Sequence, residues 1–339
     1  MRARFMASRT HCVWRRCFAK GAKGAKGKRK RQGSPHTRKK AVIDSALSNG
    51  AAEIRALDNN KGRGVVAVQP LSAGALALAE EPFASHRGLI MDVCDFCLRP
   101  LPEQSRVHTC KHTGEQYCSG ICKNRAWTRF GRTLKAVPQA MLQQRCAEYR
   151  IKYPLLALRM AASSLSRGFA SYWEPVSALC AATVEGDHKD GIPHDWREEY
   201  NLLAEALREG IAGDIEAVLE QALDVSWYAR LMGRLHLNSF RVYSGTAGDL
   251  QNANGSALYL LGSMFNHSCD PNVRVDFPHG DHRAHFVLTR AVEANEELCI
   301  SYIAAEQERM TGEQRQSALK FSHGFDCALS CSCIDRPLT

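Results

Sequence analysis

The residues with the clearest potential for chemistry lie together in the last third of the chain. Positions 266–272 read Asn-His-Ser-Cys-Asp-Pro-Asn, so an amide, an imidazole and a thiol are close neighbours. An apolar run leads into this stretch and an alternating pattern leads out, which places the polar cluster between two buried elements. Asn266 offers an amide donor and acceptor, and the ring nitrogens of His267 can fix a loop or contact a ligand. Pro271 cannot continue a helix, so the cluster is predicted to lie on a turn.

The cysteines indicate a second kind of chemistry, because they cluster in two regions. These regions hold Cys94, Cys97, Cys118 and Cys122, and later Cys327, Cys331 and Cys333. Two closely spaced pairs let two turns supply four thiolates, which is the usual way to close a tetrahedral zinc site. Four protein ligands leave no open coordination position, so a zinc in the first region is expected to be structural. The alternative is a set of buried free thiols.

These motifs resemble those of a known family. The pattern Asn-His-Ser-Cys-x-Pro-Asn is similar to the signature of SET-domain lysine methyltransferases, and residues 297–302, Glu-Leu-Cys-Ile-Ser-Tyr, resemble the second signature. The first cysteine pairs, with Tyr117 beside them and Trp127 after them, look like a MYND zinc finger. The chain is therefore identified as a member of the SET-and-MYND type over roughly residues 52–333. The alternative, a polar turn beside a core strand, does not explain the order of the motifs.

The resemblance implies an α+β fold: a mainly-β SET core of short sheets with a knot-like crossing, a helical insert, an inserted zinc finger and a cysteine-rich post-SET segment. The expected parts are a disordered basic tail (1–50), the N-terminal part of the SET domain (51–93), a MYND-like finger (94–130), the helical insert (131–235), the C-terminal SET core (236–305) and the post-SET segment (306–339). Knot-like crossings are rare, and the resemblance assigns Asn272 to holding this one.

The resemblance also implies that the chain binds S-adenosylmethionine. The expected contacts are Lys61, Arg63, Asn238, Asn266, His267, Tyr302 and Phe325. Lys61 and Arg63 belong to a Gly-containing loop, where a cation and free backbone N–H groups both suit the carboxylate of the cofactor. Alone, such a loop is usually only a turn, so its assignment depends on the family.

The implied reaction is transfer of a methyl group from this cofactor to a lysine of a protein. An in-line displacement needs a deprotonated lysine held about 3 Å from the methyl carbon, and an apolar channel lowers the lysine pKa from about 10.4. Tyr302 is the expected central residue, because its hydroxyl can orient the amine. Phe325 and His323 are expected to line the channel. Many members have Tyr at the position of His323, so we expect a more polar channel, with a changed number of methyl groups or a changed activity.

The family assigns the cysteines to two zinc sites. The finger site is Cys94, Cys97, Cys118 and Cys122, and the post-SET site is Cys269 with Cys327, Cys331 and Cys333. Where a second finger site needs a cysteine pair, this chain has Cys110 with His108 or His112, and the closing His-x3-Cys is missing. We therefore expect one finger zinc and regard a second as doubtful. The post-SET spacing, Cys-x3-Cys-x-Cys, departs from the family's Cys-x-Cys-x2-Cys, but four thiolates can still close a tetrahedron.

Helices are expected to dominate residues 130–235. Asp214 precedes a one-sided apolar pattern that it can cap, and another apolar stripe ends at Gly210. A third pattern, over 141–165, is broken at Pro154. A solvated loop, rather than a metal site, is expected to hold Asp187, His188, His194 and Asp195.

Strands are predicted on both sides of these helices. A β-branched run at 65–68 and a short strand at 75–79, separated by Gly74, predict a hairpin. Later strands are expected at 273–277, 285–288 and 298–301. Asn295 stands where the family usually has Gly, and the turn is still expected because Asn tolerates positive φ.

The net charge of +10 is unevenly distributed along the chain. Residues 1–40 hold fifteen Lys and Arg and no acidic residue, which leaves 30 of the 45 basic residues against all 35 acidic ones in the remainder. The resulting net of −5 suits a cationic, lysine-containing protein substrate such as a histone tail, although so small a charge is also unremarkable. The basic tail favours a nuclear address over an organelle transit peptide, and it allows non-specific contact with nucleic acid. A tail without any address is the third interpretation.

Composition narrows the class of protein further. No apolar run approaches the roughly 18 residues of a membrane span, so we expect no membrane contact. We further expect a monomer in the nucleus or cytoplasm. Fourteen cysteines in a chain of 339 residues without a signal-peptide core indicate metal binding in a reducing compartment. The main alternative to an enzyme is a catalytically weak or inactive interaction scaffold, which the incomplete finger and altered post-SET spacing favour. A DNA-binding regulator would need a base-reading module, and the sequence offers none.

Overall fold

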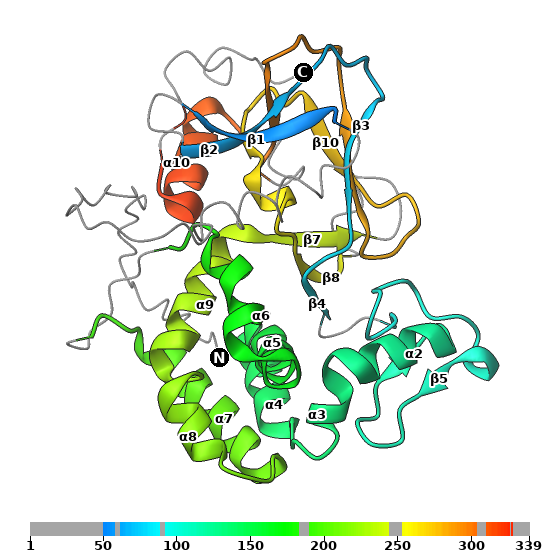
Figure 1. Ribbon diagram of the computed structural model, residues 1–339, viewed down its shortest axis with the longest axis vertical. Coiled ribbons are helices and arrows are strands. Elements are labelled where there is room, and N and C mark those ends of the chain that lie inside the picture. Colours follow the sequence, from blue (N-terminus) through cyan, green and yellow to red (C-terminus); the bar gives the residue numbers. More distant parts are fainter. Residues whose placement is uncertain are drawn as a thin grey trace, which may run out of the picture.

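The computed structural model describes residues 50–57, 62–88, 92–182, 190–243, 253–303, 310–325 and 327. Expectations for the basic tail, for Lys61, for Asp187 and His188, and for Cys331 and Cys333 lie outside these residues. Short strands gather in the upper half of Figure 1, most of the helices lie below them, and the finger projects to the lower right. Helices and separate short sheets make up the α+β fold that the sequence predicted.

The largest sheet holds the two signatures. It consists of β1 (Ala52–Leu57), β2 (Gly62–Ala67), β12 (Glu297–Ile300) and β9 (Asn266–His267), in that order. β9 runs parallel to β12, whereas the other neighbours are antiparallel. Both signatures therefore lie side by side at one edge, although β10 and β11 separate them in the sequence.

Two further sheets, each of three strands, complete the β-rich part of the fold. One joins β10 (Val273–Asp276), β11 (Ala284–Leu288) and β3 (Leu76–Glu80), and the other joins β4 (Ala84–Arg87), β8 (Ala253–Leu258) and β7 (Ser239–Tyr243). The predicted hairpin of residues 65–68 with 75–79 is wrong, because β2 pairs with β1 and β3 pairs with β11. Gly74 does adopt a positive φ of 81°, so the chain turns there without pairing the strands that flank it.

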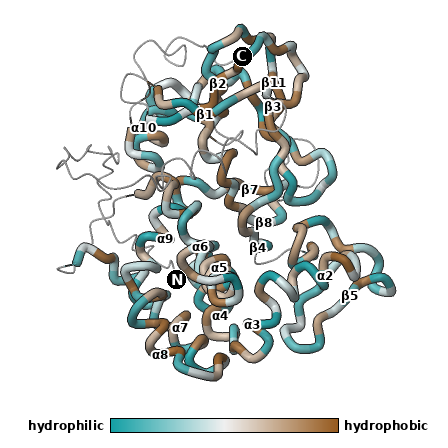
Figure 2. The backbone as a smooth tube through the Cα atoms, in the orientation of Figure 1, coloured by the Kyte–Doolittle hydropathy of each residue, from teal (hydrophilic) through white to brown (hydrophobic). Residues whose placement is uncertain are grey.

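The helical insert packs around one buried helix. Its helices are α4 (Ala140–Tyr149), α5 (Tyr153–Arg167), α6 (Phe169–Ser177), α7 (His194–Gly210), α8 (Ile215–Gln221) and α9 (Val225–Asn238). All residues from Pro154 to Ser164 are buried, so α5 is the centre of this bundle. Figure 2 shows hydrophobic and hydrophilic residues mixed along the surrounding helices, as expected for helices that bury one face.

Local signals explain where several elements begin and end. The Asp214 side chain accepts a hydrogen bond from the Ala217 N–H (3.2 Å), so the predicted cap of α8 is confirmed. Asn295 has the predicted positive φ, 69°. His194 and Asp195 do not lie in a loop, as we expected, but in the first turn of α7, where Pro193 sets the start of the helix.

The finger combines a small hairpin with a short helical segment. The hairpin is β5 (His108–Thr109) and β6 (Gln116–Tyr117), followed by α2 (Gly120–Ala126), a π-helical turn, η2 (Trp127–Gly131), and α3 (Arg132–Leu134). A 3-10 turn, η1 (Gln104–Arg106), precedes the hairpin, and another, η4 (Gly262–Met264), precedes β9. The last described helix is α10 (Gly312–His323). None of the described helices is long and apolar enough to cross a membrane.

Candidate active site and zinc centres

Tyr302 is fixed at two atoms by the segment that carries the first signature. Its hydroxyl donates a hydrogen bond to the backbone oxygen of Phe265 (2.7 Å), and its backbone N–H donates to His267 Nδ1 (2.9 Å). The parallel pairing of β9 with β12 sets Ile300 opposite His267, which brings Tyr302 to this position at the end of β12. Both the backbone and the side chain of Tyr302 are therefore fixed by hydrogen bonds to the first signature and the residue before it.

A cluster of rings surrounds this tyrosine. The His323 ring centroid lies 4.7 Å from that of Tyr302, and the Phe325 centroid lies 6.3 Å from it and 6.0 Å from that of His267. α10 ends at His323, and Gly324 takes a left-handed conformation (φ 70°) that turns the chain back towards the cluster. Four predicted site residues from the two signatures and the post-SET segment thus lie together.

The imidazoles of this cluster carry no charge near neutral pH. Burial lowers the pKa of His323 to about 4. Burial, together with the nearby His323, also lowers the pKa of His267 to about 4. An uncharged, partly buried ring cluster favours the neutral form of an amine that enters it.

Asn266 connects three strands beside this cluster. Its Nδ2 donates to Glu297 Oε1 (2.8 Å) and to the backbone oxygen of Arg63 (3.1 Å). A Cβ on Gly64 would lie only 2.4 Å from a methyl carbon of Leu57 and 2.8 Å from Asn266 Nδ2. The glycine is therefore needed for β2 to approach the first signature so closely.

Two predicted cofactor contacts are engaged with the helical insert. The Arg63 guanidinium donates to the backbone oxygen of Ala178, beyond the end of α6. Asn238 is buried at the end of α9, and its Nδ2 donates to Cys180 O and to Arg234 O (2.8 Å each). Both amide protons of Asn238 are used, so a direct contact with a cofactor would involve Oδ1.

Asn272 links the two signatures where they lie side by side. Its Nδ2 donates to the backbone oxygen of Glu297 (2.9 Å), and its Oδ1 accepts the Cys299 N–H (2.8 Å). Because Asn272 is buried and bonded to β12 on both sides of its amide, it ties the segment after β9 to that strand. These bonds stabilise the close approach of the two signatures.

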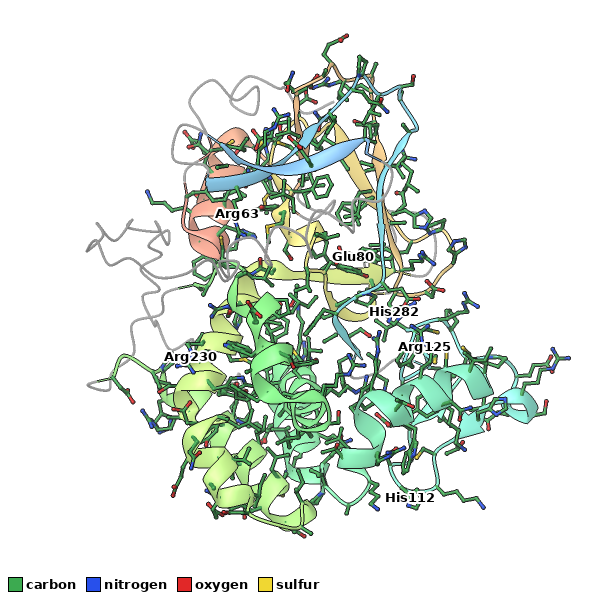
Figure 3. The ribbon with its side chains drawn as sticks, viewed as in Figure 1. Arg63, Glu80, His112, Arg125, Arg230 and His282 are labelled. Carbon is green, nitrogen blue, oxygen red and sulfur yellow. The ribbon has the colours of Figure 1, made fainter. Side chains whose placement is uncertain are left out.

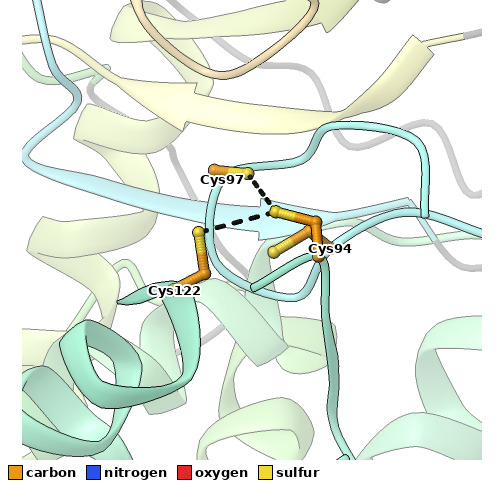
Figure 4. A group of neighbouring side chains, drawn as sticks. Cys94, Cys97 and Cys122 are labelled. Atoms are coloured by element: carbon orange, nitrogen blue, oxygen red, sulfur yellow. Dashed lines mark hydrogen bonds between the residues drawn. The ribbon is translucent and has the colours of Figure 1, made fainter. Parts of the chain in front are cut away.

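The finger brings four thiols to one point. The sulfur atoms of Cys94, Cys97, Cys118 and Cys122 all lie within 4.8 Å of one another. Figure 4 shows the sulfurs of Cys97 and Cys122 directed towards that of Cys94. α2 begins just before its ligand, because Ser119 accepts the Cys122 N–H (3.2 Å) as a helix cap. Four convergent thiols are the donor set that a structural zinc requires.

The other side of the finger does not gather a second ligand set. Within residues 92–182, Cys110 belongs to no group of three metal-binding side chains. His112 stacks instead on Trp127, with centroids 5.5 Å apart, and Lys123 Nζ donates to Thr109 O (2.9 Å). The aromatic contact thus links the hairpin to η2, and the lysine links it to α2.

The finger is attached to the rest of the molecule by a buried arginine that sequence reasoning missed. Arg159 on α5 donates to Asp95 O (2.7 Å), Ser85 O (3.1 Å) and Glu115 Oε1 (2.6 Å). Nothing in the sequence distinguishes it, because Leu and Met surround it in an apolar helix. Finger, insert and SET core meet at this one guanidinium.

A pocket of about 460 Å³, lined by both charged and apolar side chains, lies where the finger meets the strands. The His282 N–H donates to Cys97 O (2.7 Å), and Arg99 bonds Asp281 (2.8 Å) across this joint. Figure 3 shows Arg125 and His282 close together here. The cation of Arg125 is paired with Glu81. The finger is therefore attached to the strands by ion pairs at the surface as well as by the buried Arg159.

The post-SET segment supplies a second convergence of metal-binding atoms. Ligand atoms of His267, Cys269 and Cys327 lie within 4.8 Å of one another. Cys269 Sγ lies 3.8 Å from Cys327 Sγ and 3.2 Å from His267 Nε2. The first signature and the post-SET segment are therefore in contact at this point.

Comparisons with known proteins agree with this architecture. The SET domain family matches residues 62–303. A SET and MYND domain-containing protein of Dictyostelium discoideum is 26% identical over 272 residues, covering 74% of this chain and 75% of the relative. Histone-lysine N-methyltransferase ATXR4 of Arabidopsis thaliana is 28% identical, covering 82% and 86%.

Another relative and a solved structure extend the comparison. Protein-lysine N-trimethyltransferase SMYD5 of Mus musculus is 24% identical and covers 85% of this chain and 87% of its own. A solved SET domain of LSMT, bound to lysine and AdoHcy, covers 87% of this chain and 58% of its own, with 11% identity and a TM-score of 0.44. The match over residues 62–303 decides the assignment, and this chain belongs to the SET-domain family.

Proposed function

We propose that this chain is an S-adenosylmethionine-dependent methyltransferase that acts on lysine side chains of proteins. The observation that carries the proposal is the double fixation of Tyr302, by Phe265 O and His267 Nδ1, inside an uncharged ring cluster. Relatives that cover most of this chain are named as histone-lysine or protein-lysine methyltransferases. The cofactor would supply an activated methyl group, and the protein would supply the position of the amine.

Tyr302 acts on the amine through its oxygen. The hydroxyl proton is donated to Phe265 O, so towards a substrate amine the oxygen can only accept. As the methyl group arrives, the amine nitrogen becomes positive and its N–H groups become stronger donors. An acceptor fixed beforehand therefore stabilises the transition state more than the ground state.

His323 and Phe325 form the walls that exclude water from this amine. A lysine has a pKa of about 10.4 in water, so it must lose a proton before it can attack. The uncharged rings of the cluster make the ammonium form costly and lower that pKa. Alignment of the amine with the transferring group then accounts for most of the catalysis.

The cofactor is proposed to lie between β2, β9 and the post-SET segment. The residues that would hold it are Lys61, Arg63, Asn238, Asn266, His267, Tyr302 and Phe325. Arg63 and Asn266 are bonded to each other through the Arg63 backbone oxygen, which supports a shared role.

Two structural zinc ions complete the proposal. The finger zinc would be bound by Cys94, Cys97, Cys118 and Cys122, and the post-SET zinc by Cys269, Cys327, Cys331 and Cys333. We propose a single zinc in the finger, bound by the four thiols that converge there. Neither ion would have an open position for chemistry.

The substrate is proposed to be a lysine-rich protein segment such as a histone tail, bound by a monomer in the nucleus. The lysine-dense part of residues 1–40 supports a nuclear address, and it would also contact nucleic acid without reading its sequence.

Calorimetric titration with S-adenosylmethionine tests this function first. We expect the zinc-loaded protein to bind the cofactor and Asn266→Ala to bind about tenfold more weakly, a difference of ~1.4 kcal/mol. The matched control is Asn201→Ala, an exposed site on α7 that should leave binding unchanged. No binding by the folded, zinc-loaded protein would contradict the enzyme and favour the interaction scaffold.

A further inference from the structure

Glu80 lies at the end of β3, and its carboxylate holds the start of the turn that leads into the first signature. Its Oε1 accepts the N–H groups of Leu260 (2.8 Å) and Leu261 (3.1 Å), and its Oε2 accepts that of Gly262 (2.8 Å). The first N–H groups of a helical turn have no partner within that turn, and the N-cap residue of η4, Leu261, forms no capping bond with its side chain. A carboxylate from a distant strand therefore supplies the acceptor for all three groups.

The same turn ends at the acceptor of the Tyr302 hydroxyl. Phe265 follows η4 directly, and its backbone oxygen accepts the hydrogen bond from Tyr302 (2.7 Å). The N–H of Phe265 reaches Gly262 O only at 3.4 Å, longer than the usual distance of about 2.9–3.0 Å, so this bond within the turn is weak. Gly262 therefore links the carboxylate of Glu80 to the carbonyl group that orients Tyr302.

Packing against β11 fixes the turn from another side. A Cβ on Gly262 would lie only 2.5 Å from Cζ of Phe286, so the backbone of the turn contacts this ring closely. The ring of Phe265 stacks on the same ring, with centroids 4.7 Å apart and an interplanar angle of 12°. Phe286 pairs with Leu78 on β3, two residues before Glu80. β3 therefore fixes both the ring against which the turn packs and the carboxylate at its start.

We infer that Glu80 is a positioning residue for methyl transfer. Its carboxylate anchors Gly262, the anchored turn holds the carbonyl group of Phe265, and this carbonyl accepts the hydrogen bond from Tyr302. The lone pair of the Tyr302 oxygen is then directed to the substrate amine before the reaction begins, as preorganised stabilisation of a transition state requires. Glu80 acts only through the turn. The inference rests on the proposed function, in which Tyr302 orients the amine.

Glu80→Gln tests the anchor with little change of shape. The amide oxygen can still accept, but the NH2 group must face at least one backbone N–H, so the start of the turn shifts. We expect kcat to fall about 10-fold, because small misplacements of reacting groups are costly, with KM and cofactor affinity within about twofold. Glu205→Gln, at an exposed site on α7, is the matched control. The assays are run at about pH 8, above the pKa of about 7 to which burial raises Glu80.

A double-variant cycle separates positioning from a general loss of structure. If Glu80 acts through the hydroxyl of Tyr302, Glu80→Gln should cost less than about twofold in kcat once Tyr302→Phe has removed that hydroxyl. Single-turnover assays with excess enzyme measure the slow variants. Leu219→Ala, at a buried position of α8, destabilises the chain within the helical insert. It should leave kcat unchanged in both backgrounds.

The carbonyl group of Phe265 gives a readout that does not depend on activity. In protein labelled with ¹³C at the phenylalanine carbonyl carbons, its signal is assigned by its absence in Phe265→Leu. The signal should shift in Tyr302→Phe, which removes the hydrogen bond to this oxygen, and in the same direction in Glu80→Gln. Leu219→Ala should leave it in place. Glu80→Asp, which is one methylene too short to reach all three N–H groups, replaces Glu80→Gln in every measurement if the latter does not fold.

The outcomes separate this inference from the proposed function. Absence of methyl transfer by the folded, unaltered protein would overturn the proposed function and this inference with it. If the unaltered protein is active but the Phe265 signal does not move in Glu80→Gln, only the inference fails. Equal losses of kcat from Glu80→Gln with and without the Tyr302 hydroxyl would also overturn it, because the carboxylate would then support the fold and not the hydroxyl.

Discussion

At the scale of single residues, the hydroxyl of Tyr302 is the group whose loss should matter most to the reaction. Tyr302→Phe keeps the ring and the backbone bond to His267 but removes the acceptor and the bond to Phe265 O. We expect kcat to fall by about 10²-fold or more, as when one preorganised polar partner of a transition state is removed.

The measurement compares kcat with cofactor affinity. Calorimetry should show that Tyr302→Phe binds S-adenosylmethionine within about twofold of the unaltered protein. Tyr149→Phe, an exposed tyrosine on α4, is the control for loss of a hydroxyl elsewhere. Equal losses of kcat in both variants would show that the hydroxyl of Tyr302 has no special part.

A buried carboxyl gives a prediction on pH. Burial raises the pKa of Glu80 to about 7, although its oxygens accept the N–H groups of Leu260, Leu261 and Gly262. The folded pKa exceeds the ordinary value of 4.5, so the native state binds more protons between these values. Stability from this group is present below pH 4.5 and is lost as pH rises towards 7, by about 3 kcal/mol.

Urea unfolding of the unaltered protein and Glu80→Gln, from pH 4.5 to 7, measures this contribution. Histidines such as His282, whose pKa is lowered to about 4 mainly by burial, act in the opposite direction. The difference between the two proteins isolates the effect of Glu80. Parallel curves of unfolding free energy against pH would contradict it. Glu313→Gln, on the first turn of α10, is the exposed control.

At the scale of elements, local signals in the sequence predicted more than distant ones. The Asp214 cap and the positive φ of Asn295 depend on a few adjacent residues, and both are confirmed. The expected hairpin failed because β3 pairs with β11, some 200 residues later, and strand partners are not encoded locally. The helix start at Pro193 was missed because a Pro in a Gly-containing stretch also suits a loop.

The same distinction applies to the candidate site. The spacing of the cysteines and the two signatures predicted site residues that lie close together in the structure. Examples are Cys94 with Cys122 and Tyr302 with His323. Reasoning from sequence missed Glu80, at the end of a short apolar strand, and Arg159, within an apolar helix. Their roles depend on tertiary neighbours, which no local pattern reveals.

Arg159 gives a prediction at this scale, because one side chain joins three elements. Arg159→Met keeps the apolar stem but leaves the Glu115 carboxylate without its buried cation and the backbone oxygen of Asp95 without its donor. We expect a loss of about 3 kcal/mol in unfolding free energy, since removing one partner of a buried pair is costly. Arg132→Met, exposed on α3, should cost about 0.5 kcal/mol or less.

Chemical denaturation measures both losses, and a double variant tests the cause. Adding Glu115→Gln to Arg159→Met removes the unpaired charge and should restore part of the stability. If the double variant is less stable than Arg159→Met by the full cost of Glu115→Gln alone, the two residues are not coupled. Lost packing against Phe130, whose ring lies 4.6 Å from the guanidinium, would then explain the effect.

At the scale of the whole molecule, the finger is part of one body with the SET core. Arg159 joins them in the interior, and the His282–Cys97 backbone bond and the Arg99–Asp281 pair join them at the surface. The finger is therefore held in a fixed position beside the segment that connects β10 and β11. Its four convergent thiols lie beside this contact with the strands, so a metal bound by them should stabilise the whole chain.

The distribution of charge gives the last prediction, on how a lysine-rich peptide approaches. The full chain carries +10, but residues 1–40 contribute fifteen positive charges and the remainder is −5. A cationic peptide should be attracted by the remainder and repelled by the basic segment. Salt weakens both effects, because the screening length falls from about 30 Å at 0.01 M to about 10 Å at 0.1 M.

Removing residues 1–40 should therefore reverse the sign of the salt dependence. In the full chain, kcat/KM should stay level or rise across this range, whereas in the shortened chain it should fall several-fold. A peptide with the same target lysine and acidic neighbours is the matched control, and its trend should be the opposite in the shortened chain. Identical salt profiles of the two proteins would show that the basic segment does not influence the encounter, and that local contacts near Tyr302 control substrate binding.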